Sequence, residues 1–279
     1  MDTYYYLIAG LPDISLEDGK LSYTVDSFKS EIYPELSDKD KKVIDLFYLE
    51  FDNDNLLHLL KDKDYIIKNF GLFTAEELLA LIDTVKDGDI PDKKFPSYFG
   101  KFISEYFNLT IEEEYKANDI LASEYYSYAM NVKNSFVSSW FEFNLNINNI
   151  LTAISARKYK LDVTSFIVGN TEVCEMLRTS NARDFGLGDT LTYLENIQRI
   201  SEIDDLVERE KKVDLLKWDW METESFFNYF TIERLFVFLS QLQMIERWIS
   251  LDKDKGNELF RAMIKALKDG VQVPDEFRN

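Results

Sequence analysis

The sequence predicts an all-α protein made of pseudo-repeated helical subdomains. Only 10 glycines and 5 prolines occur in 279 residues, and hydrophobic residues make up 46% of the chain. This scarcity of breakers argues against β-sandwiches, collagen-like repeats and disordered linkers. Capping boxes at Thr74–Glu77 and Thr110–Glu113, in which the Thr and Glu side chains satisfy the first amides of a helix, predict two helix starts.

A long helix is expected over Val43–Leu60, where apolar residues recur near helical spacing. Ser37, shortly before this run, marks its start. The segment Asp52–Asn55 is expected to bend or interrupt the helix, because Asp and Asn favour caps. After the capping box at Thr110, a second long helical segment is expected to reach about Arg157.

Strand signals are poor, and the only two candidates are the short segments Tyr4–Ala9 and Leu161–Val168. Neither segment has an obvious hairpin partner. Breakers at Gly88–Pro91, Gly169–Asn170 and Phe185–Asp189 divide the chain into helical blocks without a flexible linker between them. The sequence therefore predicts one contiguous helical assembly.

A weak internal repeat relates Phe47–Leu60 to Phe141–Ile154, 94 residues later in the chain. The two segments share three identities, among them Asn55 with Asn149, and their apolar spacing agrees. A degenerate third copy is expected over Phe238–Leu251. Two unrelated amphipathic helices would also match to this degree, so chance is the alternative explanation. The repeat agrees with a division of this contiguous assembly into three helical subdomains, which we expect at residues 1–108, 109–195 and 196–279.

The composition excludes several classes of function. With 51 acidic and 32 basic residues the net charge is −19, which disfavours nucleic acid as a partner because its phosphates are repelled. A single cysteine rules out an internal disulfide and suits a reducing compartment. The apolar stretch Tyr4–Leu11 is too short to span a bilayer, and charged residues interrupt Phe226–Ile249. We expect a cytoplasmic protein without a membrane span of its own.

No cofactor or metal is expected. Asp52–Asn55 resembles the start of a calcium loop, but Leu57 and Lys63 stand where that loop needs Gly and Glu. The single histidine, His58, has no second histidine to complete a zinc or di-iron site. His58 is therefore expected to be a half-buried structural residue rather than a base or a ligand.

Three further patterns have both a functional and a structural interpretation. Gly186–Asp189 looks like a phosphate loop but lacks a third glycine and a Lys–Ser/Thr pair. Cys174 has Arg178 four residues away, yet a small buried hydrophobic side chain is the favoured interpretation. The aromatic run Trp218–Phe238 lacks the interleaved basic residues that bind single-stranded bases, so it indicates a helix-packing core or a protein interface.

Several segments carry a family resemblance. The motifs at Tyr4–Asp13 and Asp52–Leu57 resemble an uncharacterised bacterial family encoded beside V-type ATPase genes, and this resemblance runs the length of the chain. Asn148–Tyr159 looks like the Asp-x-x-Asn-Leu and Leu-Arg-Ala-Lys segment of the C subunit of V/A-type ATPases, which is called d in eukaryotes. Phe230–Leu235 and the helix through Ile245–Arg247 look like the closing segment of the same C subunit.

The resemblance implies a function. The C subunit is a funnel-shaped, all-α protein of three similar domains that sits on the rotor ring, receives the foot of the central stalk and has no catalytic residues. We therefore expect a non-catalytic rotor adaptor, held at the membrane periphery by its partners, the V-type ATPase stalk subunits and the proteolipid ring. A free-standing helical adaptor or regulator is the alternative. An enzyme, which could use only carboxylates for acid–base chemistry, ranks third.

The candidate partner contacts are the acid and amide positions of the repeat and one basic residue in the segment that resembles the C subunit. They are Asp52, Asp54, Asn146, Asn148 and Arg157. Their structural interpretation is helix capping and hydrogen bonding between helices, since Asp and Asn favour caps.

Overall fold

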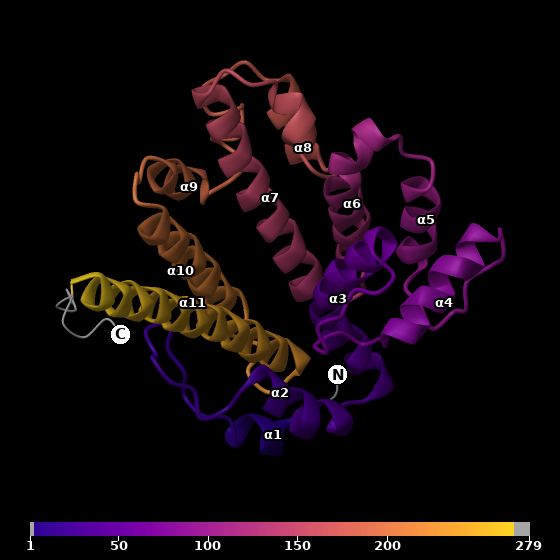
Figure 1. Ribbon diagram of the computed structural model, residues 1–279, viewed down its shortest axis with the longest axis horizontal. Helices are drawn as coiled ribbons and strands as arrows, with labels where there is room; N and C mark the ends of the chain where they lie inside the picture. Colours follow the sequence, from indigo (N-terminus) through magenta and orange to yellow (C-terminus); the bar gives the residue numbers. More distant parts are fainter. Residues whose placement is uncertain (1–2, 271–279) are drawn as a thin grey trace, which may run out of the picture.

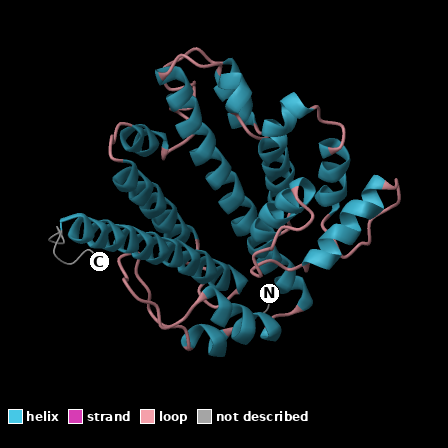
Figure 2. Cartoon of the chain, viewed as in Figure 1, coloured by secondary structure: helices cyan, strands magenta, loops and turns pink. Residues whose placement is uncertain are grey.

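The computed structural model confirms an all-α protein (Figure 1). It describes the backbone of residues 3–270 and the side chains of residues 3–252, and within that part of the chain Figure 2 shows only helices and loops. In chain order the elements are α1 (Tyr5–Ala9), α2 (Val25–Ser27), the π-helix η1 (Phe28–Ile32), the 3₁₀-helix η2 (Tyr33–Glu35), α3 (Asp38–Lys61), α4 (Ala75–Lys86), α5 (Ser97–Tyr106), the 3₁₀-helix η3 (Ile111–Lys116), α6 (Ala117–Met130), α7 (Ser135–Lys158), the 3₁₀-helix η4 (Val163–Phe166), α8 (Glu172–Thr179), α9 (Leu194–Ser201), α10 (Leu206–Glu224) and α11 (Ile232–Gly270).

Helix α3 starts where the sequence predicts but is not interrupted. The hydroxyl oxygen of Ser37 caps it by accepting a hydrogen bond from the backbone amide of Asp40, at 3.4 Å. The helix then runs for 24 residues straight through Asp52–Asn55. The predicted interruption is wrong because Asp52 and Asn55 bond to the backbone of the following loop and do not compete with the amides of their own helix.

The two predicted capping boxes are present, but the second one opens a different element. Thr74 and Glu77 cap α4, whereas Thr110 and Glu113 cap the 3₁₀-helix η3. The single long segment expected after Thr110 is also wrong, because α6 ends at Met130 and α7 begins at Ser135. Asn134 starts the new helix by accepting a hydrogen bond from the amide of Val137 at 3.0 Å.

Both strand expectations are wrong. Tyr5–Ala9 forms the short helix α1, and Val163–Phe166 forms η4. A strand needs a neighbour to satisfy its backbone, and no strand is available in the described part of the chain. The amide of Tyr4 bonds instead to the carbonyl of Phe230 at 2.8 Å, and Asp162 caps η4.

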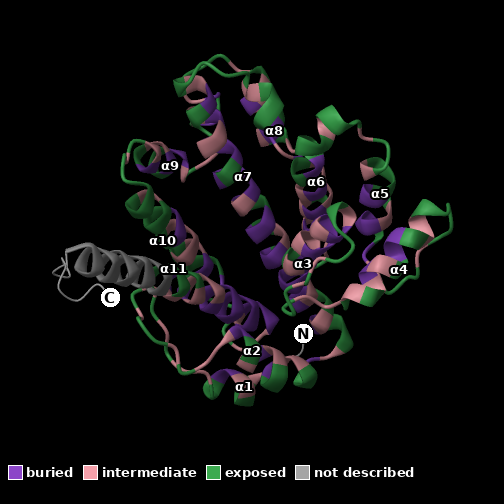
Figure 3. Cartoon of the chain, viewed as in Figure 1, coloured by how far each residue is buried: buried purple, intermediate pink, exposed green. Residues whose placement is uncertain are grey.

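Three long helices organise the molecule. The helices α3, α7 and α11 begin at Asp38, Ser135 and Ile232, so their starts are spaced 97 residues apart. The beginnings of α7 and α11 meet, since the side-chain amide of Asn134 donates to Glu233 at 2.8 Å, and Figure 1 shows the two helices diverging from there. Helix α3 packs against α4, α6 and α11, and α7 packs against α6, α8 and α9. Figure 3 shows buried residues along the inner parts of these helices.

The repeated segments Phe47–Leu60 and Phe141–Ile154 lie inside α3 and α7, which are both 24 residues long. The predicted subdomain boundary between residues 108 and 109 falls between α5 and η3. The boundary between residues 195 and 196 falls inside α9. The division into three subdomains remains a prediction.

Candidate functional site

A hollow lies between the diverging helices, and we call it the central hollow. It consists of two adjoining cavities of about 210 and 500 Å³ that share Glu50, Tyr125 and Tyr126. Its walls come from α3, α6, α7, α10 and α11. The polar side chains that line it are Glu50, Asn53, Asp54, Asn118, Asp119, Asn144, Asn148, Asn149, Thr152, Asp214, Lys217, Ser240, Gln243 and Arg247.

Charged side chains of both signs line the hollow. The Glu50 side chain reaches solvent there, but the protein around it removes part of its hydration, and this raises the pKa of its carboxyl group despite the attraction of Lys217. The same partial burial lowers the pKa of the Lys217 ammonium group, against the attraction of Asp214 and Glu50. Asp214 itself is buried and accepts hydrogen bonds from Arg247 and, at 2.8 Å, from the indole of Trp248.

Sequence reasoning missed these charged residues. Glu50, Lys217 and Arg247 come from α3, α10 and α11, and no local spacing connects them. Each one alone is indistinguishable from a solvated surface charge. Only the packing of the three helices brings them to one hollow.

Two of the predicted site residues face the hollow together. Asp54 and Asn148 line its larger cavity from α3 and α7, and Asn148 is exposed. Asp54 pairs with Lys68 at 2.9 Å and lies 3.4 Å from the Nε2 atom of His58. His58 is half-exposed and stacks on Tyr65, with ring centroids 4.3 Å apart, so it has a structural role.

The other two repeat positions are buried. Asp52 accepts hydrogen bonds from the amides of Leu72 and Phe73, at 2.8 and 3.3 Å. Asn146 donates to the hydroxyl of Tyr193 at 3.1 Å. Because both side chains are almost completely buried, they are not available to a partner in this conformation.

Arg157 fastens a loop to the end of α7. Its guanidinium donates to the carbonyls of Ser180 and Ala182, at 2.5 Å each, and lies 3.5 Å from the ring centroid of Phe185. Phe185 is buried and has a positive φ of 58°, a left-handed conformation that this clamp supports. Arg157 therefore has a structural role in addition to any contact with a partner.

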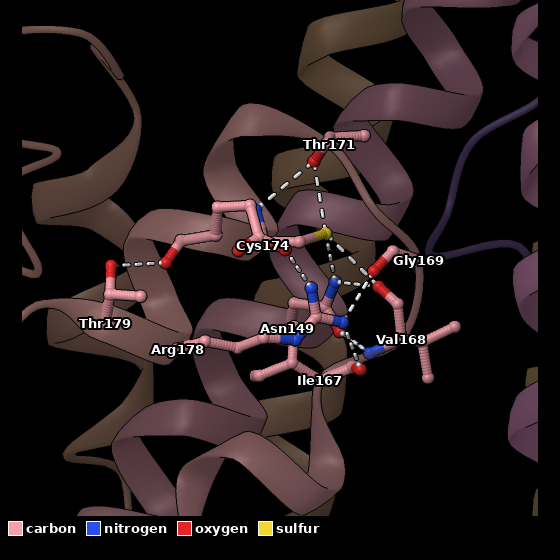
Figure 4. Close-up of polar contacts among 9 residues, drawn as sticks. Asn149, Ile167, Val168, Gly169, Thr171, Cys174, Arg178 and Thr179 are labelled. Carbon is pink, nitrogen blue, oxygen red and sulfur yellow. Dashed lines mark hydrogen bonds and ion pairs between the residues drawn. The ribbon is translucent and has the colours of Figure 1, made fainter.

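Two equivalent asparagines clamp loops to the long helices. Asn55 exchanges a pair of hydrogen bonds with the backbone of Lys68, at 2.9 and 3.0 Å. Asn149, 94 residues later, makes the same pair with the backbone of Val168, at 2.7 and 3.0 Å (Figure 4). Sequence reasoning matched these two residues but did not predict that they would hold loops.

Cys174 is part of the second clamp. Its buried thiol donates a hydrogen bond to the carbonyl of Val168 at 3.2 Å and accepts one from the hydroxyl of Thr171 at 3.1 Å. Arg178 points its guanidinium to the carbonyls of Ile167 and Gly169, as Figure 4 shows, rather than to the sulfur. The environment of Cys174 is that of a packed structural residue.

The comparison with known proteins identifies the family. A family model described as "Protein of unknown function (DUF2764)" matches residues 1–271. The chain belongs to the DUF2764 family. No curated protein and no solved structure matches it.

Two further observations concern the described part of the DUF2764 chain. Within residues 3–252, no group of three His, Cys, Asp or Glu side chains is placed to hold a metal ion. Among the helices of residues 3–270, none combines the length and the apolar character that a membrane span requires.

We expect Asp52 to make stability depend on pH. Burial raises the pKa of its carboxyl group to about 6, well above the value of about 4 in the unfolded chain. The native state therefore binds this proton more tightly, and the stabilisation is complete below about pH 4 and lost as the pH rises through about 6. As the pH rises from 4 to 7, the free energy of unfolding of Asp52→Asn should therefore increase relative to that of the wild type by up to about 3 kcal/mol.

The measurement is chemical denaturation of both proteins across this pH range. Asp64→Asn, which changes an exposed carboxylate on the following loop, is the control. Its stability should vary with pH as that of the wild type does. Parallel stability curves for the wild type and Asp52→Asn would contradict the prediction.

Proposed function

We propose that this protein is a non-catalytic rotor adaptor of a V-type ATPase, linking the central stalk to the proteolipid ring. The observation that carries the proposal is the arrangement of α3, α7 and α11, which begin 97 residues apart, and which surround a central hollow together with α6 and α10. This arrangement is what the resemblance to the ATPase C subunit leads us to expect.

The asparagine clamps support a repeated architecture. Asn55 and Asn149 make the same two hydrogen bonds from the matching segments of α3 and α7. A shared loop clamp in two helices is more specific than a shared apolar spacing, because amphipathic helices repeat the spacing by geometry alone. The pseudo-repeated build and the subdomains 1–108, 109–195 and 196–279 belong to this proposal.

The hollow suits the foot of a stalk better than a small substrate. A part that transmits torque needs rigid helices and broad contacts, and the hollow is an opening among five packed helices. Two of its charged side chains, Asp214 and Arg247, form an ion pair with one another. Asp54 and Asn148 are the contacts that we assign to the stalk. The acidic outer surface would meet basic loops of the ring, and the ATPase would hold the protein at the cytoplasmic face of the membrane.

The proposal is tested by isolating the complex. A tagged copy from gently solubilised membranes at low salt should bring the stalk subunits and the proteolipid with it. Raising the salt should release the protein from the ring before the stalk, since screening weakens contacts between exposed charges. A variant with Asp54→Arg and Asn148→Arg should recover at least tenfold less stalk, because a contact of standard size tolerates few new charges at its centre.

Asp64→Arg is the matched control, since Asp64 is an exposed acid that does not line the hollow. It should recover the stalk as the wild type does. Cells that lack the gene should yield an ATPase in which hydrolysis is uncoupled from ion pumping. An intact, coupled ATPase from such cells would contradict the proposal and favour the free-standing adaptor.

A further inference from the structure

A second cavity lies where the N-terminal ends of α3, α7 and α11 meet, and we call it the convergent pocket. It has a volume of about 680 Å³, and its lining includes Val43, Leu46, Val132 and Ile232. This volume lies within the range of roughly 300–1,000 Å³ that is typical of sites for compact ligands. The pocket is therefore large enough for one or two side chains of a partner, but not for a folded domain.

Three lysines surround the pocket. Lys39, Lys42 and Lys133 line it and are exposed. The ion pairs that lysines form with other described residues involve a different set, namely Lys63, Lys68, Lys94, Lys101 and Lys116. The charges of the three pocket lysines are thus not matched by a direct ion pair with another described residue.

The two acidic side chains that line the pocket, Asp40 and Glu233, are buried and hydrogen-bonded. Asp40 is buried and accepts a hydrogen bond from the hydroxyl of Tyr4 at 2.6 Å. Glu233 is buried and accepts hydrogen bonds from Thr231 and, at 2.8 Å, from Asn134. Asp45, which attracts Lys42, accepts the hydroxyl of Tyr33 at 2.5 Å. The accessible charge at the pocket is positive, although the chain carries a net charge of −19.

Two other features point to a protein partner. The loop that leads into α11 exposes Phe226, Phe227 and Tyr229, which are 71%, 92% and 55% accessible. Exposed aromatic side chains are enriched in protein interfaces. The first turns of α3, α7 and α11 also line the pocket, so the positive ends of three helix dipoles lie beside it and add to the attraction for carboxylates.

We propose that the convergent pocket binds a short acidic segment of a partner protein. An apolar side chain of that segment enters the pocket, and the carboxylates on either side of it meet Lys39, Lys42 and Lys133. The concave shape favours a peptide over a flat bilayer surface, and the positive rim favours an acidic peptide over a basic one. This inference does not depend on the ATPase assignment, because the pocket is separate from the central hollow.

The test uses fluorescein-labelled hexapeptides and the full-length protein. The acidic set has two Asp or Glu residues on each side of a Leu-Phe pair, and the basic set has Lys in place of these acids. Fluorescence anisotropy should show saturable binding of acidic peptides that weakens with salt, and at least tenfold weaker binding of basic ones. Hydrogen exchange should show protection in residues 38–46 and 128–135 when the acidic peptide is bound.

Two triple variants with the same change in charge distinguish the effect of the pocket lysines from the effect of the net charge of the protein. Lys39→Glu with Lys42→Glu and Lys133→Glu should weaken acidic peptide binding at least tenfold. Lys20→Glu with Lys93→Glu and Lys158→Glu, at exposed positions outside the pocket, should change it less than threefold. Thermal melts verify that both variants fold.

Three outcomes would overturn the inference. The first is that no acidic peptide binds, and the second is that both triple variants lose binding equally. The third is binding to phosphatidylserine vesicles without binding to any peptide, which would assign the lysines to a membrane surface instead.

Discussion

Replacing Gly71 with Ala should destabilise the protein by about 3–5 kcal/mol. A Cβ atom at this position would lie 2.0 Å from the Oδ1 atom and 2.6 Å from the Cγ atom of Asp52. The Asp52 carboxyl group cannot move away without losing its hydrogen bonds to the amides of Leu72 and Phe73. The variant must therefore either shift the loop or leave buried polar groups unpaired, and both are costly.

Urea denaturation with a matched control measures this effect. Gly19→Ala is the control, because a Cβ atom there meets no atom within 4 Å, and its stability should change by less than about 0.5 kcal/mol. Adding Asp52→Ala to Gly71→Ala should cost less than the sum of the two single changes, since the clash is then absent. Equal stability of Gly71→Ala and Gly19→Ala would show that Asp52 does not pack against the loop in this way.

The second large effect is expected at the asparagine clamps. Asn149→Ala should destabilise the protein by about 2–4 kcal/mol, because it leaves the amide of Val168 without its partner and leaves the carbonyl of Val168 with only the weak donor Cys174. Asn55→Ala should cost about 1–3 kcal/mol, because water can replace part of the lost bonding at the more exposed Lys68.

Asn148→Ala is the control next to the second clamp, since this exposed residue makes only a weak contact of 3.4 Å with Tyr126. Its stability should stay within about 0.5 kcal/mol of the wild type. Hydrogen exchange should locate the damage, with faster exchange at residues 167–171 in Asn149→Ala and at residues 68–73 in Asn55→Ala. A uniform loss of protection in both variants would mean that the asparagines stabilise the whole protein and do not hold separate loops.

The helices could be predicted where their signals are local. The cap at Ser37 and the box at Thr74–Glu77 act within one turn of the helix that they begin, so three or four residues of sequence contain the whole interaction. The break between α6 and α7 was missed although Asn131 and Asn134 flank it. An Asn inside an apolar pattern is compatible with a helix interior and with a cap, and the choice depends on what the flanking helices pack against.

Composition and spacing alone determined that the chain is helical and acidic, and they gave no sign of a complete calcium or phosphate loop. Only the tertiary structure decided which polar side chains are accessible. Asp52 and Asp54 are two positions apart, which turns a side chain by about 200° around the helix axis. Asp52 consequently faces a loop and is buried, while Asp54 faces the central hollow. The hollow and the convergent pocket could not be read from the sequence, because their walls come from helices that are distant in the chain and that meet only when the apolar faces of α3, α7 and α11 pack together.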